Sequence, residues 1–199
     1  MKIVCFGDSN TYGFDPRSYF GGRYEPEHRW VDILGERLSC GVVNAGENGR
    51  EVPWRTAEVR NFRMLMERHP QTDLLIIMLG TNDILQGVSV SAVAERMECF
   101  LREIKLDKSG IILVAPPQLC MGEWVSSQNM IRDSIELGRC YENVAKRSGV
   151  SFADAGQWKI PLTFDGVHFT EEGHRKFAEA ICDYLRRRKI NASDWNEST

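Results

Sequence analysis

The chain opens with Lys2-Ile3-Val4-Cys5-Phe6-Gly7-Asp8-Ser9-Asn10, and this stretch decides the fold. A short apolar run bounded by turn residues predicts a buried strand, and Gly7-Asp8 predicts the turn that ends it. Sheets covered by helices on both faces bind their ligands at the carboxyl ends of their strands. Ser9 is therefore predicted to lie at the edge of the sheet where a ligand would bind.

Four similar apolar runs follow, separated by longer segments with helical spacing of apolar residues, which is typical of βαβ units around a parallel sheet. The predicted strands are Lys2–Phe6, Gly41–Ala45, Leu74–Leu79, Ile111–Ala115 and Val150–Asp154. The predicted helices are Arg29–Leu38, Trp54–Arg68, Ser91–Ile104, Met130–Ser148 and Thr170–Arg188. Right-handed crossovers then give an α/β fold, a three-layer α/β/α sandwich of the flavodoxin-like type, with the expected strand order 2-1-3-4-5.

Three segments show neither pattern, namely Tyr12–His28, Pro116–Asn129 and Ala155–Phe164. Each follows a predicted strand, so all three should emerge on the same side of the sheet as Ser9. Their aromatic residues include Tyr12, Phe14, Tyr19, Phe20, Tyr24, Trp124 and Trp158. These rings could line a pocket or pack beneath a long loop, and the sequence leaves both interpretations open.

The composition is that of one globular domain, which we place at residues 1–190, followed by a polar tail at 191–199. A net charge of −3 gives no electrostatic basis for binding nucleic acid. No apolar stretch approaches the ~18 residues of a membrane span, and no signal-peptide pattern is found. The six cysteines lack metal-ligand spacing. We therefore expect a cytoplasmic protein that uses neither a membrane nor a metal.

Residues that suit acyl transfer follow the predicted strands along the chain, in the order Ser9, Gly49, Asn82, Asp165 and His168. A serine hydroxyl needs a neighbouring base, histidine titrates nearest neutral pH, and an aspartate three residues earlier can fix its tautomer. The backbone N–H groups of Ser9 and Gly49 and the side-chain amide of Asn82 could stabilise an oxyanion, each donor contributing roughly 3 kcal/mol.

These blocks resemble those of the SGNH (GDSL) hydrolase family, and Gly80-Thr81-Asn82-Asp83 is similar to its short-chain arylesterase and acyltransferase branch. The resemblance implies the SGNH hydrolase fold and no cofactor. It also implies Ser9 as the nucleophile, His168 as the base and Asp165 as the residue that orients it, with Ser9, Gly49 and Asn82 forming the oxyanion hole. Asn10 stands where the family usually has leucine, and Gly46 is the alternative to Gly49.

The resemblance implies a serine esterase that hydrolyses or transfers short acyl groups, above all acetyl, from esters of small alcohols, phenols or sugars. The expected partner is a small-molecule ester, and a homo-oligomer stays open. The candidate substrate-binding residues are Asp8, Asn10, Tyr12 and Trp124, with a bracing role as the alternative for Asp8. Two other functions are open: an acyl-CoA thioesterase or lysophospholipase with the same residues, and a catalytically silent module that binds carbohydrate or lipid.

Overall fold

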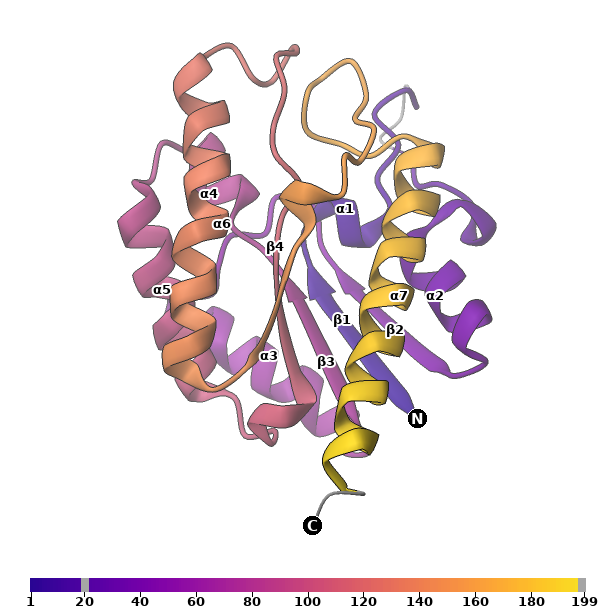
Figure 1. Cartoon of the computed structure of the whole chain (residues 1–199). Coiled ribbons are helices and arrows are strands. Elements are labelled where there is room, and N and C mark those ends of the chain that lie inside the picture. Colours follow the sequence, from indigo (N-terminus) through magenta and orange to yellow (C-terminus); the bar gives the residue numbers. More distant parts are fainter. Residues whose placement is uncertain (19–21, 197–199) are drawn as a thin grey trace.

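The protein is built on a five-stranded parallel sheet with the order β2-β1-β3-β4-β5 (Figure 1). The computed structural model describes residues 1–18 and 22–196, and side chains as far as Arg188. The strands are β1 (Lys2–Gly7), β2 (Gly41–Gly46), β3 (Leu74–Met78), β4 (Ile111–Ala115) and β5 (Ser151–Asp154). The predicted α/β class, parallel pairing and strand order are confirmed.

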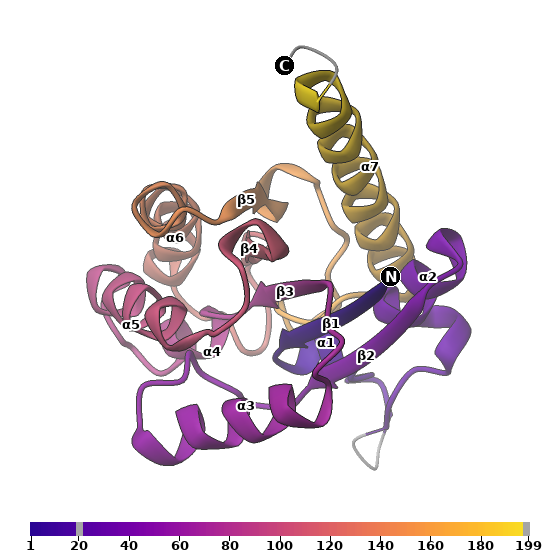
Figure 2. The same cartoon turned by 90° about the horizontal axis from the view of Figure 1, so that it is seen from below.

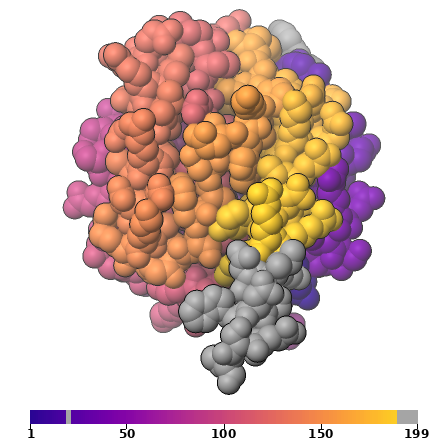
Figure 3. Space-filling view, viewed as in Figure 1, coloured from indigo at the N-terminus to yellow at the C-terminus, as the bar shows by residue number. Residues whose placement is uncertain are grey.

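Helices cover both faces of the sheet. The helices α2 (Trp30–Leu38) and α7 (Glu171–Asn196) lie on one face, and α3 (Thr56–Arg68), α5 (Val90–Glu103) and α6 (Gln128–Ser148) lie on the other (Figure 2). In Figure 3, β5 and the segment after it fill the space between α6 and α7. Of the helices in the described residues, none combines the length and apolar character needed to cross a membrane.

Alternating residues of each strand divide the core into two halves. Ile3 and Cys5 of β1 pack with the buried residues of α2 and α7, whereas Val4 and Phe6 pack with those of α3, α5 and α6. This follows from the two-residue period of a strand. All five residues of β3 are buried, as expected for a central strand covered on both faces. The two faces of the sheet therefore each contribute to one half of the core.

Short helices begin directly where two central strands end. These are α1 (Ser9–Tyr12), after β1, and α4 (Thr81–Leu85), after β3. Neither was predicted, because four or five residues are too few to show a helical period. Three-residue 3-10 helices also lie within two of the predicted irregular segments, at Pro26–His28 and Ala155–Gln157. The tight strand-to-helix turns place Ser9 and Asn82 at the same edge of the sheet.

The last helix is longer than predicted. Helix α7 continues to Asn196, past the expected end at Arg188, because no glycine or proline interrupts the chain there. Tyr19 and Phe20, which were expected among the aromatic residues near the site, lie outside the described residues.

Candidate active site

The structure brings Ser9, His168 and Asp165 together in one hydrogen-bonded chain. The Nε2 atom of His168 lies 3.0 Å from the Oγ atom of Ser9. The Nδ1 atom of the same ring lies 2.6 Å from the Oδ2 atom of Asp165. All three side chains are buried. A serine, an imidazole and a carboxylate in this order can activate the hydroxyl and hold the ring in one tautomer.

Asp165 is held as an ionised carboxylate. Its Oδ1 atom accepts hydrogen bonds from the hydroxyl of Thr163 at 2.8 Å and from the backbone N–H groups of Val167 and His168 at 2.8 and 2.9 Å. Burial acts to raise the pKa of Asp165, but these bonds and the one to the His168 ring outweigh it and hold the pKa well below its ordinary value. The carboxylate therefore keeps its charge throughout the neutral range.

Asp8 fixes the turn that presents Ser9. Its side chain accepts the backbone N–H of Asn10 at 3.0 Å and so caps the first turn of α1. Asp8 is almost fully buried, and this burial raises its pKa to about 6, against the lowering effects of the Asn10 N–H and of His168 and Arg50. The structure thus shows Asp8 bracing the turn that carries Ser9.

Asn82 is oriented by a hydrogen bond to the loop that follows β2. Its Nδ2 atom donates to the carbonyl of Arg50 at 3.0 Å. A carboxamide nitrogen has two N–H donors, so one remains for a ligand. The neighbouring Asp83 is fully buried and accepts the N–H of Val52 at 2.9 Å together with the guanidinium of Arg96. These contacts hold the loop that follows β2 against α4.

The two candidate glycines after β2 have different surroundings. The N–H of Gly46 donates to the Asn44 side chain at 3.0 Å, and a Cβ atom at Gly46 would lie 2.0 Å from the backbone N of Tyr12. Gly46 therefore allows β2 to pack closely against α1. Gly49 is exposed, has φ of +75°, and a Cβ atom there would meet nothing within 4 Å. Open space around Gly49 leaves room for a ligand.

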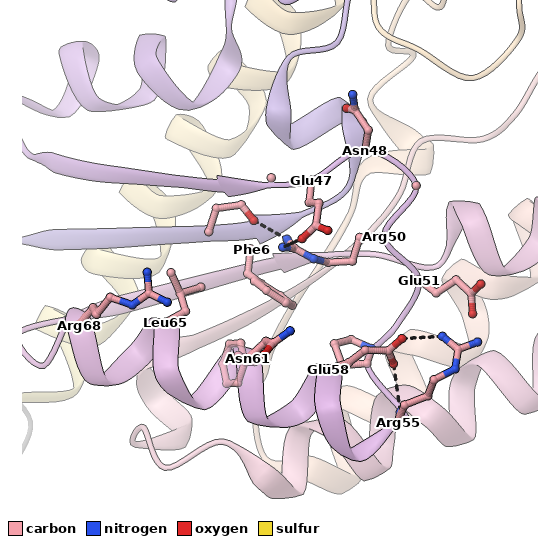
Figure 4. Close-up of a pocket in the computed structure, with 15 residues that line it drawn as sticks. Phe6, Glu47, Asn48, Arg50, Glu51, Arg55, Glu58, Asn61, Leu65 and Arg68 are labelled. Carbon is pink, nitrogen blue, oxygen red and sulfur yellow. Dashed lines mark hydrogen bonds and ion pairs between the residues drawn. The ribbon is translucent and has the colours of Figure 1, made fainter. Parts of the chain in front are cut away.

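Arg50 was not singled out from the sequence, although it directly follows Gly49. Its guanidinium donates to the carbonyls of Gly7, at 2.7 Å, and Ala45, and it lies over the ring of Phe6 with 4.2 Å to the centroid (Figure 4). Gly7 and Ala45 lie at the carboxyl ends of β1 and β2, so the Arg50 side chain connects both strand ends to the loop that contains Gly49. Burial lowers the pKa of Arg50.

A cavity of about 410 Å³ lies beside this arginine, between the end of β2 and α3 (Figure 4). Its walls include Gly49 and Arg50 together with Arg55 and Glu58 of the next segment. Ser9 and His168 do not line it. The cavity therefore does not include the hydrogen-bonded chain of Ser9, His168 and Asp165, although Gly49, the candidate oxyanion donor, lines it.

The candidate substrate-binding residues fall into two groups. Asp8 and Asn10 are buried, and their side chains bond within the protein. Tyr12 is partly buried beneath the guanidinium of Arg23, 4.3 Å from its ring centroid. Trp124 is 52% exposed and meets the His168 ring edge-on, with 4.9 Å between ring centroids. Of these four side chains, that of Trp124 is the most open to a substrate.

Other aromatic residues of the irregular segments separate in the same way. Phe14 contacts the His168 ring at a centroid distance of 4.8 Å, whereas Tyr24 is buried and donates its hydroxyl to the carbonyl of Phe169. Tyr24 therefore packs within the protein, whereas Phe14 lies directly beside the His168 ring. Among residues 1–18 and 22–188, no three His, Cys, Asp or Glu side chains group as a metal ion would require.

The sequence profile of the GDSL-like lipase/acylhydrolase family matches residues 5–176, which contain every member of the hydrogen-bonded chain. The chain belongs to this family. It is thus a GDSL-family hydrolase, and the resemblance seen in its sequence blocks is confirmed.

Solved structures and curated relatives agree with this assignment. The GDSL hydrolase described here is similar to an aryl esterase from M. smegmatis, with a TM-score of 0.82 and 27% identity over 94% of this chain and 98% of that one. It is also similar to Est24, a carbohydrate acetylesterase from Sinorhizobium meliloti, with a TM-score of 0.82 and 25% identity over 94% and 98%. A mouse isoamyl acetate-hydrolyzing esterase 1 homolog is 24% identical over 98% of this chain and 84% of that protein.

Proposed function

We propose that this GDSL hydrolase cleaves small esters of short acyl groups through an acyl-enzyme on Ser9. The observation that carries the proposal is the buried, continuous chain from Ser9 through His168 to Asp165, with atom separations of 3.0 and 2.6 Å. A hydroxyl facing an imidazole that a carboxylate orients is the arrangement of a nucleophile with its general base.

In the first half-reaction, the Oγ atom of Ser9 bonds to the ester carbonyl carbon and its proton passes to Nε2 of His168. The carbonyl oxygen becomes an oxyanion, for which the second N–H of Asn82 and the backbone N–H groups of Ser9 and Gly49 are the proposed donors. When the intermediate collapses, the bond to the alcohol oxygen breaks and His168 gives that oxygen its proton. Asp165, ionised throughout, stabilises the imidazolium in between.

In the second half-reaction, water attacks the acyl group on Ser9. His168 takes a proton from the water and returns it to the Ser9 oxygen as the carboxylic acid leaves. An alcohol in place of water would give acyl transfer by the same steps.

A short acyl group, with acetyl favoured, is supported by two observations. The carbohydrate acetylesterase and the isoamyl acetate-hydrolyzing esterase homolog to which the chain is similar both have the acetyl group in their names. Phe14 and Trp124 also flank the His168 ring, so large rings already occupy space beside the reacting atoms. The alcohol portion is proposed to come from a small alcohol, a phenol or a sugar.

The test is a hydrolysis panel of aryl acetates, acetylated sugars and an acyl-CoA thioester, with wild-type protein, Ser9→Ala and the matched control Ser91→Ala. Ser91 is an exposed serine in the first turn of α5. We expect acetate esters to be cleaved by the wild type and by Ser91→Ala, but not by Ser9→Ala. A thioester preference, or activity retained by Ser9→Ala, would contradict the proposal.

A further inference from the structure

The side-chain amide of Asn10 forms hydrogen bonds with the backbone on both sides of His168. Its Nδ2 atom donates to the carbonyl of Val167 at 3.1 Å, and its Oδ1 atom accepts the N–H of Phe169 at 2.9 Å. These are the residues directly before and after His168, and they lie more than 150 positions away along the chain. Asn10 is 4% exposed, so water does not compete for these bonds.

Asn10 is itself held in place by its backbone. Its N–H donates to Oδ1 of Asp8 at 3.0 Å, and its carbonyl accepts the indole N–H of Trp30 at 3.0 Å. Trp30 is completely buried. Each polar atom of Asn10 therefore has a partner within the protein, and the side chain is buried. Because Asn10 directly follows Ser9, its contacts also affect the position of Ser9.

Some of the other bonds to this region fix the ring within its own loop, whereas others join that loop to residues 120–124 and to Tyr24. Asp165 bonds the ring and the backbone of His168, and the N–H of Thr163 donates to the His168 carbonyl at 2.7 Å. Contacts inside one loop do not set the distance between that loop and α1. The Asn10 amide joins the two elements, since it starts one peptide bond from Ser9 and ends one residue to either side of His168.

We propose that Asn10 is a positioning residue that sets the separation of Nε2 of His168 from Oγ of Ser9, a role that rests on the function proposed above. Proton transfer depends steeply on this separation, and a misplacement of about 1 Å can cost on the order of 100-fold in rate. Leucine, which the family usually has at this position, would supply neither bond. In this chain the Asn10 amide therefore positions His168, the proposed base.

The test compares two substitutions with a matched control. Asn10→Leu removes both bonds. Asn10→Asp is isosteric, but its carboxylate cannot donate to the Val167 carbonyl, whereas the neutral acid can donate there and still accept from Phe169. The control is Thr72→Val, which removes a partly buried hydrogen bond of 2.6 Å to the His69 carbonyl at the opposite, amino-terminal edge of the sheet.

We expect kcat/KM for an aryl acetate to fall about 10- to 100-fold in Asn10→Leu, mainly through kcat, and to stay within about threefold in Thr72→Val. The activity of Asn10→Asp relative to wild type should rise as the pH falls, because burial favours the neutral acid. Ionisable groups around Asn10 and Trp30 are Asp8, Asp165, His168 and His174, together with Tyr24, Arg29 and Arg50. They are present in both proteins, so this ratio largely cancels their titration.

A second readout does not require turnover. The proton between Nδ1 of His168 and Asp165 should give a low-field ¹H NMR signal in the wild type and in Thr72→Val, and it should exchange away in Asn10→Leu as the ring loses its fixed position. An unchanged signal in Asn10→Leu would overturn the proposal. So would kcat/KM within threefold of wild type in both Asn10 variants at every pH. If the wild type itself cleaves no ester, the proposed function fails, and the NMR signal still decides the role of Asn10.

Discussion

Replacing His174 with phenylalanine should make the protein resist acid. His174 has no exposed surface and packs between the rings of Tyr24 and Phe169, at centroid distances of 5.1 and 5.2 Å. Its Nδ1 atom accepts the backbone N–H of Trp30 at 3.4 Å, and its Nε2 atom has no hydrogen-bond partner among residues 1–18 and 22–188. Burial, with a smaller effect of His168 and Arg29, lowers the pKa of His174 from 6.5 to about 3.

The lowered pKa determines the sign of the effect. Between about pH 6.5 and pH 3 the unfolded chain binds a proton at His174 and the folded protein does not. The free energy of unfolding therefore falls as the solution is acidified through this range. With pKa values of 6.5 and about 3, the loss between pH 7.5 and 4.5 amounts to about 3 kcal/mol from this residue. That is a large share of a typical domain's stability of about 5–15 kcal/mol.

The assay is urea unfolding at pH 7.5 and 4.5 of the wild type, His174→Phe and the control His28→Asn, which replaces an exposed histidine. The quantity to compare is the change in unfolding free energy between the two pH values, because any pH-independent packing cost of the substitution cancels. We expect His174→Phe to lose about 3 kcal/mol less than the wild type and the control. Equal losses in all three proteins would refute the reasoning.

Three further predictions concern the site. Asn82→Ala should lower kcat by roughly 100-fold with a smaller change in KM, while the exposed control Asn143→Ala stays active; a raised KM with normal kcat would make Asn82 a substrate-binding residue instead. Asp8→Asn keeps the acceptor for the Asn10 N–H but cannot ionise. The folded pKa of Asp8, about 6, lies above the ordinary 3.8, so the wild type loses stability as the pH rises through 6. The stability of Asp8→Asn minus that of the wild type, from thermal or urea unfolding, should therefore increase by up to about 3 kcal/mol between pH 3 and pH 8. A difference that does not change with pH would contradict this. Acetyl esters of nitrophenol should be cleaved at least about tenfold faster than octanoyl esters, whereas an open apolar groove would gain about 0.8 kcal/mol for each buried CH₂, so rates that rise from acetyl to octanoyl would favour a lysophospholipase.

The strands and the long helices could be predicted because their signals are local, whereas the strand order was expected from the type of α/β fold and not from periodicity. Each strand is a short apolar run whose alternate residues enter the two core clusters, and each long helix repeats its apolar positions. The short helices α1 and α4 carry no such repeat. They form because Asp8 caps the first one and because Gly80, with φ of +117°, turns the chain into the second.

The site was predictable only as far as sequence blocks carry chemistry. Ser9, Asp165 and His168 could be named from residue type and order, and the structure brings them together. Two sets of bonds could not be predicted from the sequence, because they depend on how distant segments meet in space. They are the bonds of Asn10 to Val167 and Phe169 and those of Arg50 to Gly7 and Ala45. The exposure of Gly49 and the packing of Gly46 against Tyr12 likewise emerge only from the fold.

The account rests on Ser9 as the nucleophile, and reaction with a fluorophosphonate tests this most directly. In that reaction the Ser9 oxygen bonds to phosphorus and fluoride leaves, so the protein gains the mass of one phosphonyl group. The account predicts one adduct per chain, located on the peptide that contains Ser9, with loss of esterase activity in proportion and no adduct in Ser9→Ala. Full labelling of Ser9→Ala, or an adduct on another residue in the wild type, would contradict it.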